Sequence, residues 1–130
     1  MQESEKPSYQ ILLVDDEPSV NSSIRMLLDF DGHSVQTADS GESALTLLQP
    51  GRFHLVITDY YMLGMKGDEL AALIKLRHSG MPIIMITAFA DVLQESGKVK
   101  DVVDYLLLKP FSLPDLRQAI EIVMSTPPAR

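Results

Sequence analysis

Three carboxylates, one hydroxyl and one ammonium each follow directly on a short apolar run of this sequence. They belong to Asp15, Asp16, Asp59, Thr87 and Lys109. Carboxylates gathered in one crevice repel one another, and a divalent cation relieves that repulsion. Because the candidate ligands are all oxygens, Mg²⁺ is the expected ion, held through one or two carboxylates, waters and a phosphoryl group. The residue set therefore predicts phosphoryl-transfer chemistry.

Within this set, Asp59 is the best candidate for the nucleophile. It stands alone at the end of its apolar run, whereas Asp15 and Asp16 form a pair suited to holding the ion. A carboxylate that attacks a phosphoryl group forms an acyl phosphate, which is one of the standard covalent roles of aspartate. The metal, the Lys109 ammonium and the Thr87 hydroxyl would then meet the charge on the phosphoryl oxygens from separate sides.

Each of these residues also has an ordinary structural explanation when it is taken alone. Asp59 could cap the turn after its strand. Thr87 could bond to backbone, and Lys109, which precedes a proline, could be solvated. The interpretation as a site rests on their coincidence, because polar residues at successive strand ends would converge on one crevice.

The elements that must position these residues alternate regularly along the chain. Short apolar runs predict five strands, which cover residues 10–14, 34–38, 55–58, 82–86 and 102–108. Helices are predicted after them, at about residues 18–30, 41–49, 66–78 and 91–102, with a last helix after a Ser112 cap. This alternation predicts an α/β fold, a doubly wound parallel sheet with helices on both faces. The carboxyl ends of its strands would face the crevice where ligands bind.

The composition limits the class of protein. A chain of 130 residues with 45% hydrophobic and 22% charged residues is expected to form one globular domain. A net charge of −7 would repel a phosphate backbone, so no direct binding to nucleic acid is expected. There is no cysteine, no apolar run long enough to span a membrane and no signal-peptide pattern, so the cytoplasm is the expected location. Residues 1–9 are expected to form a flexible arm, 10–124 the domain, and 125–130 a flexible tail or the start of a linker.

Histidines are not counted among the site residues. His33, His54 and His78 lie at the ends of predicted segments and share no metal-ligand spacing. We therefore expect them to have structural or solvated roles.

Four segments of the chain, LLVDDEPSV, LVITDYYMLGMKG, PIIMITAFA and LLLKPF, carry the predicted site residues. In this order and at this spacing they resemble the receiver domain of two-component response regulators, over nearly the whole chain. The resemblance implies a five-stranded sheet with the flavodoxin-like strand order 2-1-3-4-5. It also implies a cis peptide bond between Lys109 and Pro110.

The resemblance implies a role for each site residue. Asp59 would accept a phosphoryl group from the phosphohistidine of a histidine kinase or from a phosphotransfer protein, and would later lose it to water. Asp16 and Asp59 would bind Mg²⁺ directly, Asp15 would help through water, and the backbone carbonyl of Tyr61 would be a further ligand. Such a domain is a signalling switch that catalyses only its own phosphorylation and dephosphorylation. Its output would be a change in contacts with an output domain or target protein through the fourth helix, fifth strand and fifth helix, and a weak homodimer is compatible with that surface.

The chain departs from the usual family pattern in the loop after Asp59. Leu63 stands where the family usually has proline, and Lys66 stands where it usually has aspartate. Tyr61 and Phe89, each two residues beyond a predicted site residue, are aromatic where many relatives have small or polar side chains. We hypothesise that this pair shields the acyl phosphate and slows its hydrolysis. The alternative is that both are loop aromatics that serve only packing.

Two further departures lie later in the chain. Leu106 occupies the position of the family's switch aromatic, three residues before Lys109. Tyr105 is one residue earlier, and because neighbouring residues of a strand point to opposite faces, it cannot simply take that role. Residues 91–102 contain the segment SGKVKDV, whose glycine and β-branched residues are poor helix formers. The fourth helix is therefore predicted to be short or mobile.

Three other functions are less consistent with this sequence than a phosphorylated switch. A receiver-like interaction module that is not phosphorylated usually lacks one of the acids, the threonine or the lysine, and this chain has them all. A flavodoxin-like cofactor binder needs a glycine- or hydroxyl-rich phosphate loop where this chain has Asp15, Asp16 and Glu17. A phosphatase with an aspartyl intermediate would want a second acid close after Asp59, where two tyrosines follow.

Overall fold

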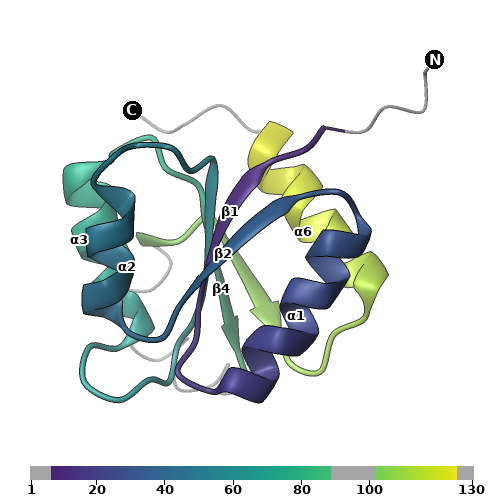
Figure 1. The fold of residues 1–130 in the computed structure, drawn as a ribbon, viewed down its shortest axis with the longest axis horizontal. Helices are drawn as coiled ribbons and strands as arrows, with labels where there is room; N and C mark the ends of the chain where they lie inside the picture. Colours follow the sequence, from purple (N-terminus) through teal and green to yellow (C-terminus); the bar gives the residue numbers. More distant parts are fainter. Residues whose placement is uncertain (1–6, 89–101, 126–130) are drawn as a thin grey trace.

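A five-stranded parallel sheet with helices on both faces forms the fold, as a computed structural model describes it for residues 7–88 and 102–125 (Figure 1). The strands are β1 (Gln10–Val14), β2 (Ser34–Ala38), β3 (Leu55–Asp59), β4 (Ile83–Thr87) and β5 (Tyr105–Leu108), in the spatial order β2-β1-β3-β4-β5. The helices are α1 (Pro18–Phe30), α2 (Gly41–Leu48), α3 (Gly67–Arg77) and α6 (Leu113–Ser125). The predicted fold class and strand order are therefore confirmed. No helix in the described ranges combines the length and the hydropathy needed to cross a membrane.

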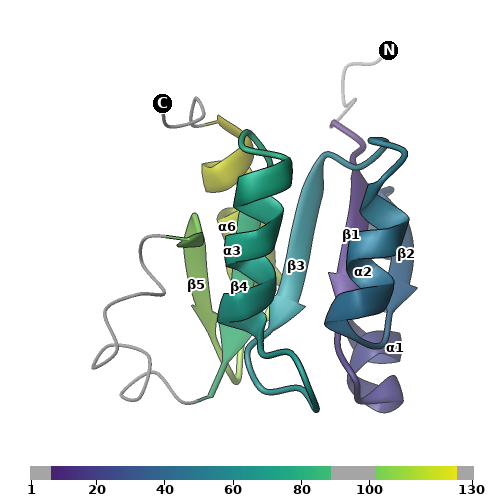
Figure 2. The ribbon, with the colours of Figure 1, turned by 90° about the vertical axis from the view of Figure 1, so that its left-hand side faces the viewer.

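The central strands are apolar because both faces of the sheet are covered. Every residue of β3 and β4 is buried, and so are four of the five residues of β1. The helices α2 and α3 pack on one face, and α1 and α6 pack on the other (Figures 1 and 2). A parallel sheet buried on both sides requires such continuous apolar runs rather than an alternation of apolar and polar residues.

The core has two halves, because successive side chains of a strand point to opposite faces of the sheet. On the α1/α6 face, the buried cluster includes Ile11, Ile57 and Ile84 with Ile24, Leu28 and Leu116. On the α2/α3 face, it includes Leu12, Val56 and Ile83 with Leu48, Leu70 and Ile74. Burial of each side chain of this size contributes about 1.5–3 kcal/mol to the free energy of folding. The two layers together therefore hold the edges of the sheet in fixed positions.

The fifth strand is shorter than predicted. The sequence indicated residues 102–108, but β5 covers only Tyr105–Leu108. Val102 has helical geometry, and Val102 and Val103 both pack against the α2/α3 side of the core. Consecutive residues of a strand would point to opposite faces, so this packing excludes them from β5. The predicted fourth helix falls almost wholly within residues 89–101, which lie outside the described residues.

An ion pair at the amino-terminal edge of the sheet fixes where β5 begins. The Oδ2 of Asp104 accepts hydrogen bonds from the Nζ of Lys75, at 2.8 Å, and from the backbone N–H of Ile83, at 2.7 Å. Lys75 also donates to the backbone oxygen of Met81, at 2.8 Å. These bonds join the end of α3 to the starts of β4 and β5, and therefore set the register with which both strands enter the sheet.

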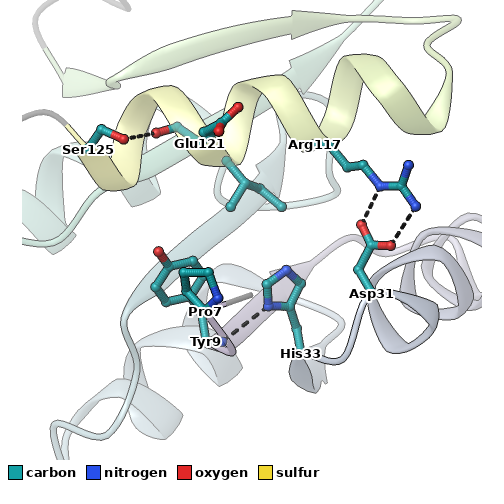
Figure 3. Close-up of a pocket in the computed structure, with 8 residues that line it drawn as sticks. Pro7, Tyr9, Asp31, His33, Arg117, Glu121 and Ser125 are labelled. Carbon is teal, nitrogen blue, oxygen red and sulfur yellow. Dashed lines mark hydrogen bonds and ion pairs between the residues drawn. The ribbon is translucent and has the colours of Figure 1, made fainter. Parts of the chain in front are cut away.

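The amino-terminal ends of β1, β2 and β3, at this same edge of the sheet, are held by Tyr9 and two histidines; Figure 3 shows Tyr9 and His33. The Tyr9 ring stacks on His33, with ring centroids 5.5 Å apart, and meets His54 edge-on at 6.0 Å. The Nδ1 of His33 accepts the backbone N–H of Tyr9 at 3.1 Å, and the Nδ1 of His54 accepts that of Gln10 at 2.9 Å. The structural role predicted for these two histidines is confirmed. The arm expected over residues 1–9 is anchored at its last residue.

A second contact at this end ties α6 to α1 (Figure 3). The Nε and an Nη of Arg117 donate to the two carboxylate oxygens of Asp31, each at 2.8 Å. Such a two-pronged pair fixes geometry as well as distance. Together with Tyr9 and His33, these side chains line a pocket of about 410 Å³ beside α6.

The His33 contact predicts a specific loss of stability in mild acid. Burial lowers the pKa of His33 from 6.5, and the Asp31 carboxylate opposes this only in part; Arg117 and Glu121 line the same pocket. A group with a lowered folded-state pKa stabilises the fold fully above the unfolded pKa, and this contribution is lost as the pH falls from about 6.5 through the folded pKa. We expect the free energy of unfolding to decline over that window, as measured by urea denaturation at a series of pH values.

The matched control for this prediction is His33→Asn, which keeps a hydrogen-bond acceptor near the position of Nδ1 but does not titrate. Below pH 6.5, its free energy of unfolding should fall less steeply than that of the wild type. Parallel pH profiles for the two proteins would contradict the prediction.

Candidate functional site

The predicted site residues meet at the edge of the sheet formed by the carboxyl ends of the strands. Because the strands are parallel, β1, β3, β4 and β5 all end at this edge. Asp59 is paired with Ile86, so Thr87 lies one residue further along the neighbouring strand. Thr87 is paired with Leu108, so Lys109 follows directly on the next strand. Asp59 is itself the last residue of β3 rather than the first residue after it.

An ion pair between Asp59 and Lys109 lies at the centre of this edge. The Oδ1 of Asp59 is 3.1 Å from the Nζ of Lys109, and only 8% of Asp59 is exposed. Burial raises the pKa of Asp59, while the Lys109 ammonium and the backbone N–H of Tyr61 lower it, and the Asp16 charge raises it again. The lysine thus opposes the effect of burial and favours the ionised carboxylate.

Asp15 is buried in the same crevice, with 3% of its surface exposed. Its Oδ1 accepts the backbone N–H of Glu17 at 2.9 Å. Burial raises the pKa of Asp15 to about 6; the Glu17 N–H lowers it, the Asp59 charge raises it, and the Lys109 charge lowers it. The charges of Asp59 and Lys109 both act on Asp15, so the three side chains influence one another electrostatically at this edge of the sheet.

Asp16 lies at the mouth of this crevice and is turned toward the loop after β3. Its Oδ2 accepts the backbone N–H of Leu63 at 2.7 Å. Its charge raises the pKa of both Asp15 and Asp59, so it acts on the same group of residues. A further pocket of about 310 Å³ opens beside this pair and is lined also by Asn21 and Asp39.

Thr87 and Lys109 are joined through the backbone. Thr87 is buried, and its backbone oxygen accepts the Lys109 N–H at 2.9 Å. The peptide bond between Lys109 and Pro110 is cis, as the resemblance implied. Both residues are therefore held at the edge by strand pairing, not by loop conformation alone.

The residues present fit a hard divalent cation by the chemistry of their donors. The carboxylates of Asp15, Asp16 and Asp59 offer only oxygen; the charge of Asp16 raises the pKa of the other two, and the charge of Asp59 raises that of Asp15. In the ranges 7–88 and 102–125, no group of three acidic or histidine side chains is arranged so that it could hold a metal ion by itself. Mg²⁺ does not require one, because it usually keeps several waters and uses one or two carboxylates.

Sequence reasoning missed two polar groups beside this crevice. The Nδ2 of Asn21 donates to the backbone oxygen of Asp15 at 2.8 Å, while its Oδ1 is buried without a donor among the described residues. The other missed group is the backbone N–H of Leu63. The position of Asn21 one turn into the helix after the acidic pair was a signal for the first, but a backbone donor leaves no signal in the residue types.

The three residues predicted to modulate the site have different surroundings. Tyr61 is 46% exposed, meets Tyr60 edge-on at 5.2 Å, and has the Nζ of Lys66 5.4 Å from its ring centre. Leu106 packs against Met85, whereas Tyr105 packs against the core on the α1/α6 face. The prediction that Tyr105 and Leu106 point to opposite faces is confirmed. Phe89 lies outside the described residues.

Gly67 allows the loop after β3 to pass close to the site. Its backbone N–H donates to the Tyr60 oxygen at 2.9 Å, and a Cβ at this position would collide with the Asp59 backbone oxygen and lie 2.9 Å from the Tyr60 Cα. Because both atoms are backbone atoms, the loop or the strand end would have to move. The glycine therefore fixes the position of Asp59 indirectly.

Comparison with known proteins identifies the family. The family model described as response regulator receiver domain matches residues 11–121. The chain is 36% identical over 118 residues to the transcriptional regulatory protein GlrR of Escherichia coli (strain K12), covering 91% of this chain and 26% of GlrR. It is 33% identical over 119 residues to the probable transcriptional regulator ycf27 of Cyanidium caldarium, covering 92% of this chain and 47% of that protein.

Solved structures agree with this result. A response regulator receiver domain protein from Clostridium thermocellum matches with a TM-score of 0.82 and 29% identity, covering 90% of this chain and 94% of that chain. The response regulator protein TrrA from Thermotoga maritima, solved in complex with Mg(2+)-BeF, matches with a TM-score of 0.81 and 30% identity, covering 88% and 98%. The chain belongs to the response regulator receiver domains of two-component systems, which are signalling domains. It spans about a quarter to a half of the length of the curated relatives named above.

The close approach at Gly67 predicts that Gly67→Ala destabilises the domain. Alanine is the better helix former by up to about 1 kcal/mol, but a collision with backbone typically costs about 1–3 kcal/mol and should outweigh that gain. Urea denaturation would measure the difference. Gly80→Ala is the matched control, because a Cβ at that position meets no atom within 4 Å. Equal stability of the two variants would contradict the prediction.

Proposed function

We propose that the domain is a phosphorylation-driven switch and that Asp59 is its phosphoacceptor. The observation that carries this proposal is the ion pair of Asp59 with Lys109, 3.1 Å apart, in a crevice shared with Asp15 and Asp16. A buried carboxylate whose charged form is stabilised by an adjacent cation is suited to act as a nucleophile. The same cation is placed to meet the charge of an incoming phosphoryl group.

The proposed reaction transfers a phosphoryl group from a phosphohistidine to Asp59. A lone pair of the Asp59 carboxylate attacks phosphorus, the new O–P bond forms as the P–N bond breaks, and the electron pair of the broken bond returns to the imidazole of the donor. The Lys109 ammonium then pairs with a phosphoryl oxygen, and the Thr87 hydroxyl donates to another. Water later hydrolyses the acyl phosphate, so the domain catalyses only its own phosphorylation and dephosphorylation.

Mg²⁺ is the proposed cofactor. Asp15, Asp16, Asp59 and the backbone carbonyl of Tyr61 would hold the ion, with Asp15 acting through water. When bound, Mg²⁺ supplies neutralisation of the charge on the carboxylates and the phosphoryl oxygens. The Mg(2+)-BeF complex of TrrA supports the same choice of ion for this chain.

The proposed partners follow from the same chemistry. The phosphodonor would be a histidine kinase or a phosphotransfer protein, and the output would be changed contacts with an output domain or target protein in the cytoplasm. GlrR and ycf27 are named as transcriptional regulators and extend well beyond the matched region, which supports such an output. We propose that these contacts are made by the fourth helix predicted at residues 91–102, by β5 and by α6. In β5 and α6, Leu108 and Ile122 expose apolar side chains. A weak homodimer would use the same surface. No direct contact with nucleic acid or membrane is proposed.

Incubation with Mg²⁺ and acetyl phosphate, followed by intact-mass measurement, tests the phosphoacceptor. The wild type should gain the mass of one phosphoryl group, and Asp59→Ala should gain none. Lys109→Gln should react about 100-fold more slowly, in line with the loss of one donor to developing charge.

Asp29→Asn is the control, because it removes an exposed carboxylate on α1, away from the crevice. It should be phosphorylated like the wild type. If the wild type gains no mass, the domain is an interaction module that is not phosphorylated. If Asp59→Ala gains mass like the wild type, the phosphoacceptor is another residue.

We further propose that Tyr61 and Phe89 shield the acyl phosphate from water. The double variant Tyr61→Asn with Phe89→Glu should lose its phosphoryl group faster than the wild type, because polar side chains admit and orient water. The decay is measured by intact mass after removal of the phosphodonor. Tyr61→Phe is the matched control, since it keeps the ring, and should decay like the wild type. An unchanged lifetime in the double variant would contradict the proposal.

A further inference from the structure

The hydrogen bond between Leu63 and Asp16 crosses the mouth of the crevice. It joins the Leu63 N–H to the Asp16 Oδ2 at 2.7 Å, between residues 47 positions apart in the chain. The Leu63 side chain is 86% exposed, so it contributes little to the core. What this residue offers to the site is its backbone N–H. A proline at this position would have no N–H to offer.

The donor is held in place by its own neighbours. Met62, the preceding residue, is buried against the α2/α3 side of the core. At the far end of the loop, Gly67 donates to the Tyr60 oxygen at 2.9 Å and closes the loop on itself. These contacts restrain the position of the Leu63 N–H, which in turn restrains the Asp16 carboxylate that accepts it.

Without such a contact, electrostatic repulsion would favour movement of the Asp16 side chain out of the crevice. It is only partly buried, and its charge is repelled by the carboxylates of Asp15 and Asp59, whose pKa values it raises. A carboxylate has two oxygens, so one N–H on Oδ2 leaves Oδ1 available to a cation. Groups that hold a metal ligand in orientation usually strengthen metal binding.

We propose that the Leu63 N–H is a positioning donor that holds the Asp16 carboxylate in orientation for Mg²⁺. This proposal rests on the proposed function, in that Asp16 is taken as a ligand of that ion.

Titration calorimetry with Mg²⁺ alone, on the full chain, tests the proposal. Leu63→Pro removes the N–H and should weaken Mg²⁺ binding about 10-fold, the lower end of the range for lost orienting partners of metal ligands. Leu63→Ala keeps the N–H and should bind like the wild type. Thermal unfolding without Mg²⁺ establishes that each variant is folded. A folded Leu63→Pro protein that binds Mg²⁺ as tightly as the wild type, or more tightly, would overturn the proposal.

Amide hydrogen exchange provides a second test that does not depend on the proline variant. The Leu63 amide should exchange slowly in the metal-free wild type and faster in Asp16→Ala. Fast exchange in the wild type would overturn the proposal while leaving the proposed function intact. Failure of the wild type to bind Mg²⁺ would overturn the Mg²⁺ part of the proposed function and this inference with it, whereas failure of phosphorylation alone would leave the orienting role of Leu63 standing.

Discussion

The structure of the site depends on one interaction, the pairing of the buried Asp59 carboxylate with the Lys109 ammonium. Burial disfavours the charged form of a carboxylate and raises the pKa of Asp59, and the lysine 3.1 Å away offsets part of that effect. The two residues are 50 positions apart in sequence, and they meet because β3, β4 and β5 are parallel and end at the same edge. The whole α/β scaffold can be understood as the means of holding this pair at the rim of the sheet.

Excess negative charge around that pair is offset in part by backbone donors. Asp15 accepts the Glu17 N–H, Asp16 accepts the Leu63 N–H, and the Tyr61 N–H lowers the pKa of Asp59. These partial charges do not cancel three carboxylates, and burial, together with the charges of Asp59 and Asp16, raises the pKa of Asp15 to about 6. The crevice is thus arranged to favour a cation or a cation with a phosphoryl group, which is the physical basis for the switch proposed above.

The edges formed by the amino ends and by the carboxyl ends of the strands have different roles. At the amino edge, His33 and His54 hold the entry to β1, and Arg117 ties α6 to α1 through Asp31. These contacts lie at the end of the strands opposite to Asp15, Asp16 and Asp59. At the carboxyl edge, the polar groups are crowded and only partly satisfied, so that edge can respond to a ligand while the other keeps the fold unchanged.

Most of the fold and the chemistry of the site were determined by the sequence itself. Apolar runs of strand length, each followed by a polar residue, predicted the parallel sheet and the edge where Asp59, Thr87 and Lys109 meet, because strand periodicity and parallel pairing leave few other arrangements. The alternation of side chains also separated Tyr105 from Leu106. Only the tertiary structure decided that β5 begins at Tyr105, where Val102 and Val103 both turn into the core, and that Asp16 is held by Leu63. The reason is physical: packing and backbone hydrogen bonds depend on where distant segments come together, and a backbone N–H is the same in nearly every residue type.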